Sequence, residues 1–234
     1  YHRSKTGGGS WEFTKKMPKQ WQVKYKNLIF NIKPMGFKHT GLFPEQAVNW
    51  DWMIQKIKNE KRQIKVLNLF AYTGGATVAC LSAGASVCHV DSSKGMTTWA
   101  KENVTSSGLQ DRPVRFIIDD VVKFVNREIR RGNFYDAIIM DPPSYGRGAK
   151  GEVWQFEENI YDLVELCSKV LSDKPLFFLI NSYTTGISSK VLENILRLTV
   201  AKNNKGKIEA GEIGLPMQNS ELVLPCGIYG RWEK

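Results

Sequence analysis

Between residues 64 and 202, five short apolar runs alternate with five segments of helical character. This order is typical of a parallel sheet covered by helices on both faces, with right-handed crossovers. Ligands of such sheets bind at the carboxyl ends of the strands, so the loops that follow the strands carry most of the functional information. The expected strands are 64–70, 86–91, 114–118, 135–140 and 175–180, and the expected helices are 74–84, 93–108, 121–131, 157–171 and 188–202.

Segments before and after this alternation add further elements. Residues 21–33 alternate between apolar and polar side chains, which predicts two short strands. Pro44 is well placed to open a helix that continues to about residue 60. Residues 207–214 and 221–232 predict a closing antiparallel pair. The chain as a whole is therefore expected to adopt an α/β fold.

The formal net charge of +10 is unevenly distributed. Residues 1–26 hold seven lysines and arginines but a single acid, Glu12. A basic segment of this kind suits an anionic partner, RNA or DNA first, and a solvated face without a dedicated partner is the equally weighted alternative. We expect two parts, a basic N-terminal extension with a β-hairpin over residues 1–34 and an α/β domain over residues 35–234.

The four cysteines, Cys80, Cys88, Cys167 and Cys226, show no C-x-x-C spacing. Neither a metal site nor a disulfide framework is expected from this pattern, and a reducing cytoplasm fits it best. No stretch approaches the ~20 consecutive apolar residues that a membrane span needs. The sequence leaves the oligomeric state open.

Residues typical of nucleoside sites follow the first two strands of the alternation. Gly74 and Gly75 form a strand-to-helix turn, where the missing Cβ atoms let a ligand approach the free N–H groups of the helix start; a plain tight turn is the alternative. Asp91 ends the next strand, where an acid can accept both ribose hydroxyls or cap a helix. Its place one strand after the glycine turn favours the ribose. The pattern G-x-G-x-x-G is absent, which counts against a dinucleotide oxidoreductase.

Two acids, Asp119 and Asp120, follow the third strand. Either side chain could accept a hydrogen bond from the exocyclic amine of an adenine. Asp120, immediately before the next helix, is the better candidate of the two, and a helix N-cap is the alternative role for either acid.

The fourth strand ends in Asp141, Pro142 and Pro143. The prolines fix φ and have no N–H group, so the corner is rigid, and the carbonyls of Asp141 and Pro142 stay free to accept hydrogen bonds. The carboxylate and these carbonyls form an acceptor cluster that suits an amine or another N–H donor. Tyr145 adds a ring on which a base could stack.

Three stretches, VLNLFAYTGGATVACLSAGA, VDSS and IIMDPPSYG, resemble motifs I, II and IV of class I S-adenosylmethionine-dependent methyltransferases. More narrowly, the form N-x-F-x-Y-T-G-G together with DPPS is similar to the 23S ribosomal RNA large-subunit methyltransferases that modify cytosine C5 or guanine N7. The resemblance covers about residues 35–185. It implies a Rossmann-like, seven-stranded and mostly parallel sheet whose last strand is antiparallel, S-adenosyl-L-methionine as cofactor, and RNA as partner.

The same resemblance implies roles for single residues. It places Asp91 on the ribose, Asp120 by the adenine, and Asp141 with Pro142 at the transferred methyl group. The segment GLFPEQ is similar to a family lead beside the methionine end of the cofactor, with Glu45 in place of the family's acid. The expected cofactor-binding residues are Phe43, Gln46, Asn68, Phe70, Tyr72, Thr73, Gly74, Gly75, Asp91, Ser92, Asp119, Asp120 and Asp141.

Two departures from the family bear on the target atom. Methylation of cytosine C5 needs a nucleophilic cysteine, which the family places after the fifth strand, where this chain reads INSYTTG. Ser144, not an aromatic residue, directly follows the two prolines. Cytosine C5 is therefore disfavoured, and a ring or exocyclic nitrogen is favoured.

The sequence thus predicts methyl transfer to a base nitrogen of ribosomal RNA, with Asp141, Pro142, Pro143 and Tyr145 at the catalytic centre. We expect no separate RNA-binding module before the sheet, so the basic extension and the loop YGRGAKGEVW would hold the RNA. A methyltransferase that acts on a small molecule or a protein, and a non-catalytic RNA-binding module, are the alternatives. The expected substrate contacts are Arg147, Lys150, Trp154, Asn181 and Tyr183.

Overall fold

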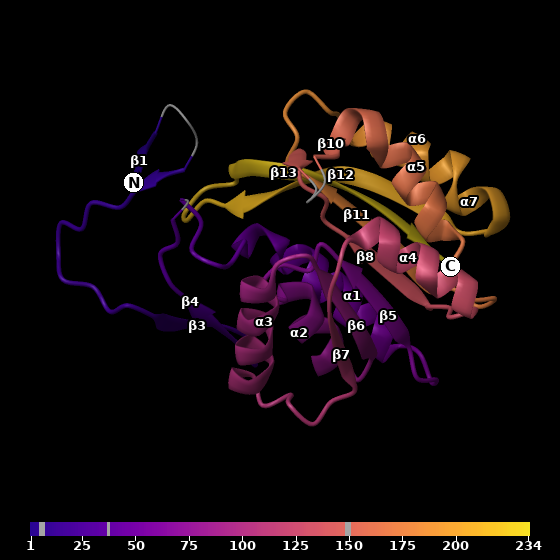
Figure 1. Ribbon diagram of the computed structural model, residues 1–234, viewed down its shortest axis with the longest axis horizontal. Coiled ribbons are helices and arrows are strands. Elements are labelled where there is room, and N and C mark those ends of the chain that lie inside the picture. The colour runs from indigo at the N-terminus through magenta and orange to yellow at the C-terminus, as the bar shows by residue number, and fades with distance from the viewer. Residues whose placement is uncertain (5–7, 37, 148–150) are drawn as a thin grey trace.

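A seven-stranded sheet forms the centre of the computed structural model, which describes residues 1–4, 8–36, 38–147 and 151–234 (Figure 1). Its strand order is β12-β13-β11-β8-β5-β6-β7. Neighbours from β11 to β7 are parallel, whereas β13 is antiparallel to both strands beside it. The strands are β5 (Lys65–Leu69), β6 (Ser86–Asp91), β7 (Val114–Ile118), β8 (Ala137–Met140), β11 (Phe177–Ser182), β12 (Lys207–Pro216) and β13 (Val223–Glu233).

The expected α/β fold is confirmed, and every expected strand and helix of the alternation has a counterpart. Helix ends follow local chemistry: Ser93 and Asp120 cap the helices that follow them, and Gly132 ends one helix in the left-handed conformation. The single helix expected over 188–202 is broken at Thr199. The helices are η1 (Pro44–Gln46), α1 (Ala47–Lys58), α2 (Gly75–Ser82), α3 (Lys94–Ser106), α4 (Val121–Arg131), α5 (Phe156–Ser168), α6 (Ser189–Leu198) and α7 (Val200–Asn203).

Helices cover both faces of the sheet, because successive residues of each central strand point to opposite sides and both sides are apolar (Figure 1). One core lies under α4, α5 and α6 and contains Ile138 and Phe178. The other lies under α1 and α2 and contains Ile139 and Leu179. This alternation puts the residues at positions 141 and 181, one step beyond β8 and at the end of β11, on the α1 side.

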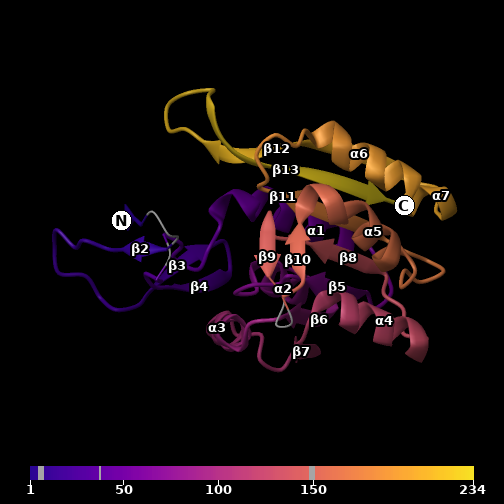
Figure 2. The same cartoon turned by 45° about the horizontal axis from the view of Figure 1, so that its top comes forward.

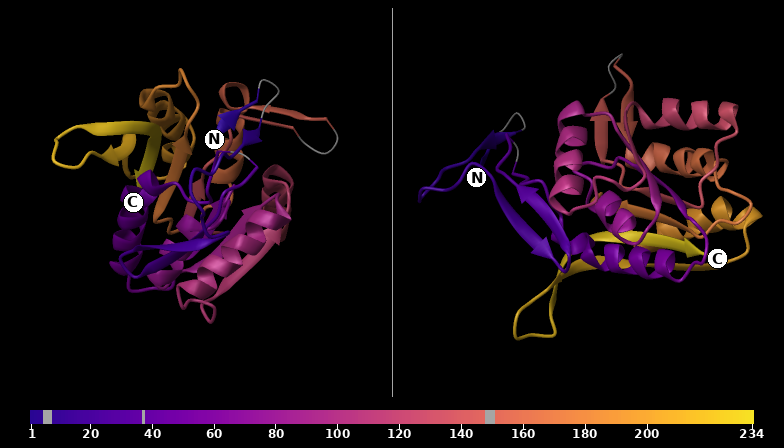
Figure 3. Two further views of the ribbon diagram at one scale, coloured as in Figure 1. Left: turned by 90° about the vertical axis from the view of Figure 1, so that its left-hand side faces the viewer. Right: turned by 90° about the horizontal axis from the view of Figure 1, so that it is seen from below.

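The predicted N-terminal strands form an antiparallel hairpin, β3 (Trp21–Tyr25) and β4 (Leu28–Ile32), with Lys26 at a φ of 52° in its turn. Leu28 and Phe30 are fully buried in the α1-side core, so the hairpin packs against the main body. A further short pair, β1 (His2–Arg3) and β2 (Gly9–Ser10), lies out from the body beyond this hairpin (Figure 3).

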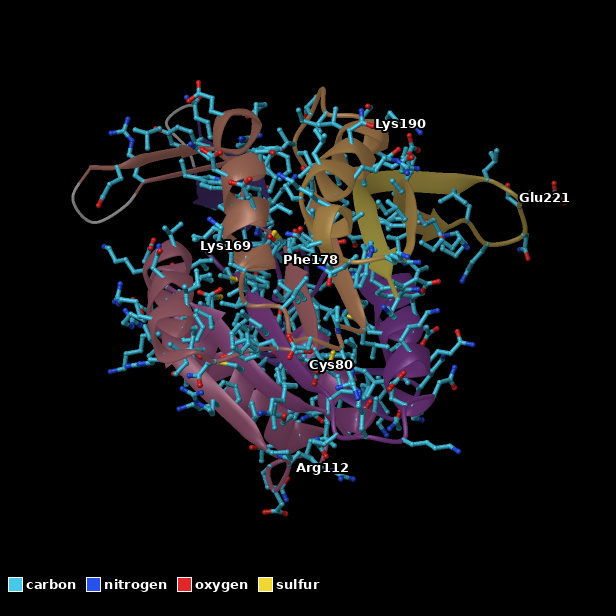
Figure 4. All side chains as sticks on the ribbon, turned by 90° about the vertical axis from the view of Figure 1, so that its right-hand side faces the viewer. Cys80, Arg112, Lys169, Phe178, Lys190 and Glu221 are labelled. Atoms are coloured by element: carbon cyan, nitrogen blue, oxygen red, sulfur yellow. The ribbon has the colours of Figure 1, made fainter. Side chains whose placement is uncertain are left out.

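Two other hairpins extend from the sheet. The strands β9 (Tyr145–Arg147) and β10 (Val153–Gln155), which the sequence did not predict, pair antiparallel after the proline corner (Figure 2). The turn between β12 and β13 carries Glu221 away from the body, whereas Phe178 lies within the central sheet (Figure 4). Among the described residues, no helix combines the length and the apolar character needed to cross a membrane.

The strand order reverses between β5 and β8. From β5 the chain adds β6 and β7 on one side, and it then returns to place β8 on the other side of β5. The register pairs Leu69 with Met140, so the residues that follow these two strands meet at the same point. Because helices diverge from such a reversal, it is where ligands of doubly wound sheets bind.

A buried polar chain lies between α2 and the face of the sheet that α2 covers, below this point. Asn68 Nδ2 donates to Thr77 Oγ1 at 2.9 Å, and the same hydroxyl shares a hydrogen bond with His89 Nδ1, 3.0 Å away. Burial lowers the pKa of His89 to about 3, which keeps the imidazole neutral at ordinary pH.

Substitution of His89 by Gln is expected to make the free energy of unfolding depend less on pH in the acidic range. Unfolded histidine takes up a proton below about pH 6.5, but the native imidazole does not until about pH 3, so the free energy of unfolding falls as the pH drops through this window, by about 1.4 kcal/mol per unit at most. Urea unfolding at pH 4 to 7 measures the slope. His2→Gln, at an exposed position, is the control, and equal slopes for His89→Gln and the native chain would contradict the assignment.

Candidate functional site

The ends of β5, β8 and β11 meet a loop and a helix around one cavity. The loop before α1 and the first half of α1 close the cavity on one side, and the turn from β5 to α2 closes it on another. Its lining residues are Leu42, Phe43, Gln46, Trp50, Asn68, Phe70, Ala71, Tyr72, Thr73, Gly75, Ala76, Ile139, Asp141 and Asn181. Eight residues expected at the cofactor from the sequence are among them: Phe43, Gln46, Asn68, Phe70, Tyr72, Thr73, Gly75 and Asp141.

The turn after β5 has a rare backbone conformation. Phe70 and Tyr72 have φ values of 53° and 50°, in the left-handed region that residues with a Cβ seldom adopt, and Gly74 has a φ of 82°. Each non-glycine residue held there costs on the order of 1–3 kcal/mol, and such strain concentrates at functional sites. The strained turn points its side chains into the cavity.

The two glycines of this turn are required by packing. A Cβ on Gly74 would lie 2.9 Å from the Cβ of Ala100, and one on Gly75 would lie 2.9 Å from the ring of Trp50. The glycines therefore let α2 approach its neighbouring helices α1 and α3. This reason differs from the close approach of a ligand that the sequence suggested.

Asp91 joins the tips of two strands. One carboxylate oxygen accepts from the backbone N–H of Tyr72 and the other from that of Ser93, both at 2.8 Å. The N-cap of α3 is Ser93, so Asp91 does not have the capping role that was its alternative. Neither Asp91 nor the exposed Ser92 lines the cavity, and their contact with a ribose stays a prediction.

Asp119 and Asp120 lie outside the cavity lining. Asp120 is the N-cap of α4 and accepts from the N–H of Lys123 at 2.9 Å, which is the structural alternative considered for it. Asp119 pairs with Arg127. Their expected contact with an adenine therefore remains untested.

The corner after β8 is braced from outside. Trp154 Nε1 donates to the Pro143 carbonyl at 2.6 Å, and Thr184 Oγ1 donates to Ser144 Oγ at 2.9 Å. The carbonyls of Asp141 and Pro142 accept no hydrogen bond from the residues that the structure describes. The acceptor pair expected from the sequence is thus available to a ligand.

Two acids lie at this corner without a cation. Glu45 is buried, and neither it nor Asp141 has an ion-pair partner among the described residues. Burial, and secondarily the charge of Glu45, raise the pKa of Asp141 to about 7. Burial and the Asp141 charge likewise raise the pKa of Tyr183 above its usual value.

Aromatic rings surround this acidic pair. The ring centroid of Phe43 lies 5.8 Å from that of Tyr72 and 5.5 Å from that of Tyr183. Buried carboxylates and ring faces both attract a cation. The residues present therefore fit a ligand that brings one positive charge on an apolar body, as the sulfonium of S-adenosylmethionine does.

A network of hydrogen-bonded side chains, built around three amides, lies behind the cavity. The sequence predicted some of its members at the site but not others. Asn49 Nδ2 donates to Gln46 Oε1 at 2.8 Å and to Asn181 Oδ1 at 2.9 Å, and Gln46 Nε2 donates to the hydroxyl of Tyr183 at 2.7 Å. Arg231 Nε donates to Asn49 Oδ1 at 3.1 Å. Gln46, Asn181 and Tyr183 were expected at the site from motifs; Asn49 and Arg231 carry no motif and emerge from the fold.

The remaining substrate candidates lie along the β9–β10 hairpin. Tyr145 is exposed and its hydroxyl accepts from Arg147 Nε at 2.9 Å. Trp154 is partly buried, and its ring centroid lies 6.2 Å from that of Phe70. Its hydrogen bond to the Pro143 carbonyl braces the corner, so its ring is not free to stack on a base. Lys150 lies outside the described residues.

A larger cavity, of about 720 Å³, opens where the strands begin. Its wall includes Arg62, Lys65 and Arg115. Arg62 is paired with Asp136 at 2.7 Å, and no strand tips converge there. Size alone does not make it the functional site, because the convergent polar groups are at the opposite edge of the sheet.

Comparisons with known proteins agree with this geometry. A family model described as S-adenosylmethionine-dependent methyltransferase matches residues 2–197. A methyltransferase structure from Agrobacterium tumefaciens, described as SAM-dependent, superposes with a TM-score of 0.91 at 36% identity and covers 98% of this chain and 75% of that one.

Two curated relatives match part of the chain. The ribosomal RNA large subunit methyltransferase K/L of Pseudoalteromonas atlantica is 31% identical over 70% of this chain and 23% of that protein. The ribosomal RNA large subunit methyltransferase I of Photobacterium profundum is 33% identical over 55% of this chain and 32% of that protein. The matched region therefore spans only about a quarter to a third of these relatives.

Asp141→Asn is expected to stabilise the ligand-free protein at alkaline pH. The native pKa of about 7 exceeds the unfolded value of about 3.9, so ionisation of Asp141 destabilises the fold progressively between these values, by up to about 4 kcal/mol at pH 8, and not at all below pH 3. Urea unfolding at pH 4 and pH 8 tests this.

The matched control is Asp120→Asn, which changes an exposed carboxyl and keeps a good capping residue. A stability gain for Asp141→Asn that is the same at both pH values, or none at pH 8, would contradict the assignment.

Proposed function

Because the chain belongs to the family of S-adenosylmethionine-dependent methyltransferases, we propose that it transfers a methyl group to a base nitrogen of ribosomal RNA. The observation that carries the proposal is Asp141, which lines the cavity at the tip of β8, together with the buried Glu45, whose charge helps to raise the pKa of Asp141. Neither acid has an ion-pair partner among the described residues. The names of the curated relatives support the choice of ribosomal RNA. Such a substrate would place the protein in the cytoplasm.

The proposed cofactor site joins the cavity to the first strand tips. Phe43, Gln46, Asn68 and the strained turn at Phe70 and Tyr72 would hold the cofactor near Asp141, and Asp91 would lie towards its ribose. When bound, the cofactor supplies a methyl group on a positively charged sulfur, which needs no further activation. The protein's contribution is then position and electrostatics.

Asp141 and the Pro142 carbonyl would orient the attacking nitrogen and stabilise the positive charge that grows on it. A carboxyl with a pKa near 7 can also accept the proton that an amine loses after methylation. The rigid corner, braced by Trp154 and Thr184, keeps these acceptors fixed. A base within an RNA helix would have to leave its stack to reach them.

The lack of a cysteine among the described residues that line the cavity supports nitrogen as the target, although Cys226 on β13 lies close enough to Glu45 for their charges to interact. Asn181, Ser182 and Tyr183 occupy the position where the resembled cytosine-C5 enzymes carry their nucleophile. No cysteine is among the residues lining the cavity.

The experiment is transfer of a labelled methyl group from S-adenosylmethionine to ribosomal RNA from cells that lack the protein, followed by mass mapping of the modified nucleoside. We expect one methylated base, with transfer abolished by Asp141→Ala while cofactor binding by calorimetry persists. Efficient transfer to a small molecule or a protein, with none to RNA, would replace the substrate; no uptake of the cofactor would remove the activity.

Neutralising Lys15, Lys16 and Lys19 to Gln is expected to weaken RNA binding at low salt. All three are exposed in the basic extension. The logarithm of the RNA association constant falls linearly with the logarithm of the salt concentration, and each lost lysine–phosphate contact makes this slope less steep by about 1. The matched control neutralises Lys58, Lys61 and Lys65, which are exposed on the far side of the molecule, where the strands begin. Equal slopes for the two triple variants would show that the extension does not hold the RNA.

A further inference from the structure

Arg231 lies on β13, two strands away from the proline corner, and is nearly inaccessible, with 8% of its surface exposed. Its guanidinium lies 4.1 Å from the ring centre of Tyr229 and 4.8 Å from that of Trp52. These rings hold the guanidinium plane against α1, where Nε and a terminal nitrogen both donate to Asn49 Oδ1.

An arginine has donors and no acceptor. The atom of Asn49 that faces Arg231 must therefore be the amide oxygen, and its nitrogen must face the other way. That nitrogen has two hydrogens, and they reach Gln46 Oε1 at 2.8 Å and Asn181 Oδ1 at 2.9 Å. Arg231 thus fixes which end of the Asn49 amide donates, and Asn49 in turn fixes the orientation of the side-chain amides of Gln46 and Asn181.

The consequence for Asn181 is directional. Its oxygen is taken by Asn49, so its amide nitrogen faces away from Asn49. Within the part of the chain that the structure describes, this nitrogen makes no hydrogen bond. The fully buried side-chain nitrogens without a partner there are His89 Nε2 and Trp232 Nε1, so the amide nitrogen of Asn181 is accessible to solvent. Asn181 lines the cavity, so the cavity is where the amide hydrogens are accessible.

Asn181 and Asp141 are neighbours at this edge of the sheet. β8 and β11 are parallel and pair Met140 with Ile180, so the next residue of each strand follows directly. Both belong to the α1 side, as Ile139 and Leu179 do. A carboxylate acceptor and an amide donor therefore lie side by side at the cavity.

We propose that Arg231 is a positioning residue which, through Asn49, turns the amide N–H groups of Asn181 toward the substrate, next to the acceptor Asp141. A base edge that matches this pair has an exocyclic amine beside an unprotonated ring nitrogen. The amine donates to Asp141 and is the nucleophile, and the ring nitrogen accepts from Asn181. The guanine edge at N7 and O6, which has only acceptors, does not match.

The identity of the edge rests on the proposed function, whereas the orientation of Asn181 does not. Side-chain amide hydrogen exchange, measured by NMR on protein with ¹⁵N-labelled asparagine, tests the orientation without any substrate. Both amide hydrogens of Asn49 should exchange slowly and those of Asn181 quickly, with assignments from Asn49→Asp and Asn181→Asp. Slow exchange at Asn181 in the native chain overturns the proposal, and this measurement needs no Arg231 variant to fold.

Two variants of Arg231 separate orientation from packing. Lys has donors only, so Arg231→Lys should keep the native exchange pattern and most of the activity. Gln can accept as well as donate, so Arg231→Gln should release Asn49 and Asn181 and lower kcat/KM at least tenfold. Arg62→Gln, which removes the partner of Asp136 at the opposite edge of the sheet, is the matched control. Equal losses for Arg231→Lys and Arg231→Gln would assign a packing role and overturn the proposal.

A double-mutant cycle tests whether Arg231 acts through Asn181. In an Asn181→Ala background, Arg231→Gln should change kcat/KM less than twofold, because the group it orients is gone. A tenfold loss that persists in this background overturns the proposal. The methylated nucleoside should carry its new methyl on an exocyclic amine, and 7-methylguanosine would overturn the assigned edge. Native exchange behaviour with no transfer to any RNA would support the orientation and remove the proposed function alone.

Discussion

The site depends on one partly exposed carboxylate, that of Asp141 at the tip of β8, whose desolvation raises its pKa to about 7. A strand of four buried residues, Ala137 to Met140, carries the backbone into the core, and two prolines then turn it sharply at the cavity. Glu45, which is buried, adds a second negative charge, and no ion pair among the described residues offsets either. Ionisation of these two acids near one another disfavours the empty fold and would be offset by a positively charged ligand. The feature that weakens the free protein as the pH rises from about 4 to 7 therefore also suits a cation in the cavity.

The strand tips could be predicted from the sequence because their signals are local. A buried apolar run followed by Gly-Gly, by Asp or by Asp-Pro-Pro specifies where a strand ends and what stands there, and parallel strands bring these ends to one edge. Asp141 was found in this way, whereas Phe70 and Tyr72 were expected only from the resemblance to the methyltransferase motif; all three line the cavity. The same reasoning could not separate a ligand contact from a structural contact. Asp120 caps α4, and the glycines at 74 and 75 make room for Ala100 and Trp50.

Other parts of the site follow from register between distant segments and have no local signal. Nothing in the residue pattern places Asn49, on a helix, beside Arg231, which lies 182 residues later. Trp154 was expected to contact the substrate from a basic loop, yet the β9–β10 pairing turns its indole N–H to the Pro143 carbonyl. In each case the partner becomes visible only once the strand pairing is known, because hydrogen-bond direction depends on which atoms the fold brings together.

The closing strands therefore do more than complete the sheet. The family model matches residues 2–197, which include every strand tip at the cavity but not β12 or β13. Because β13 is antiparallel to β11, it places Tyr229 opposite Asn181 and Arg231 opposite Leu179, on the side that α1 covers. A parallel strand of the same composition would have a different register, and the arginine would not meet Asn49. The proposed cofactor site and the region that we propose orients the amide of Asn181 would then be separable parts of one fold. The first belongs to the motifs at the strand tips, and the second depends on an antiparallel strand at the opposite end of the chain.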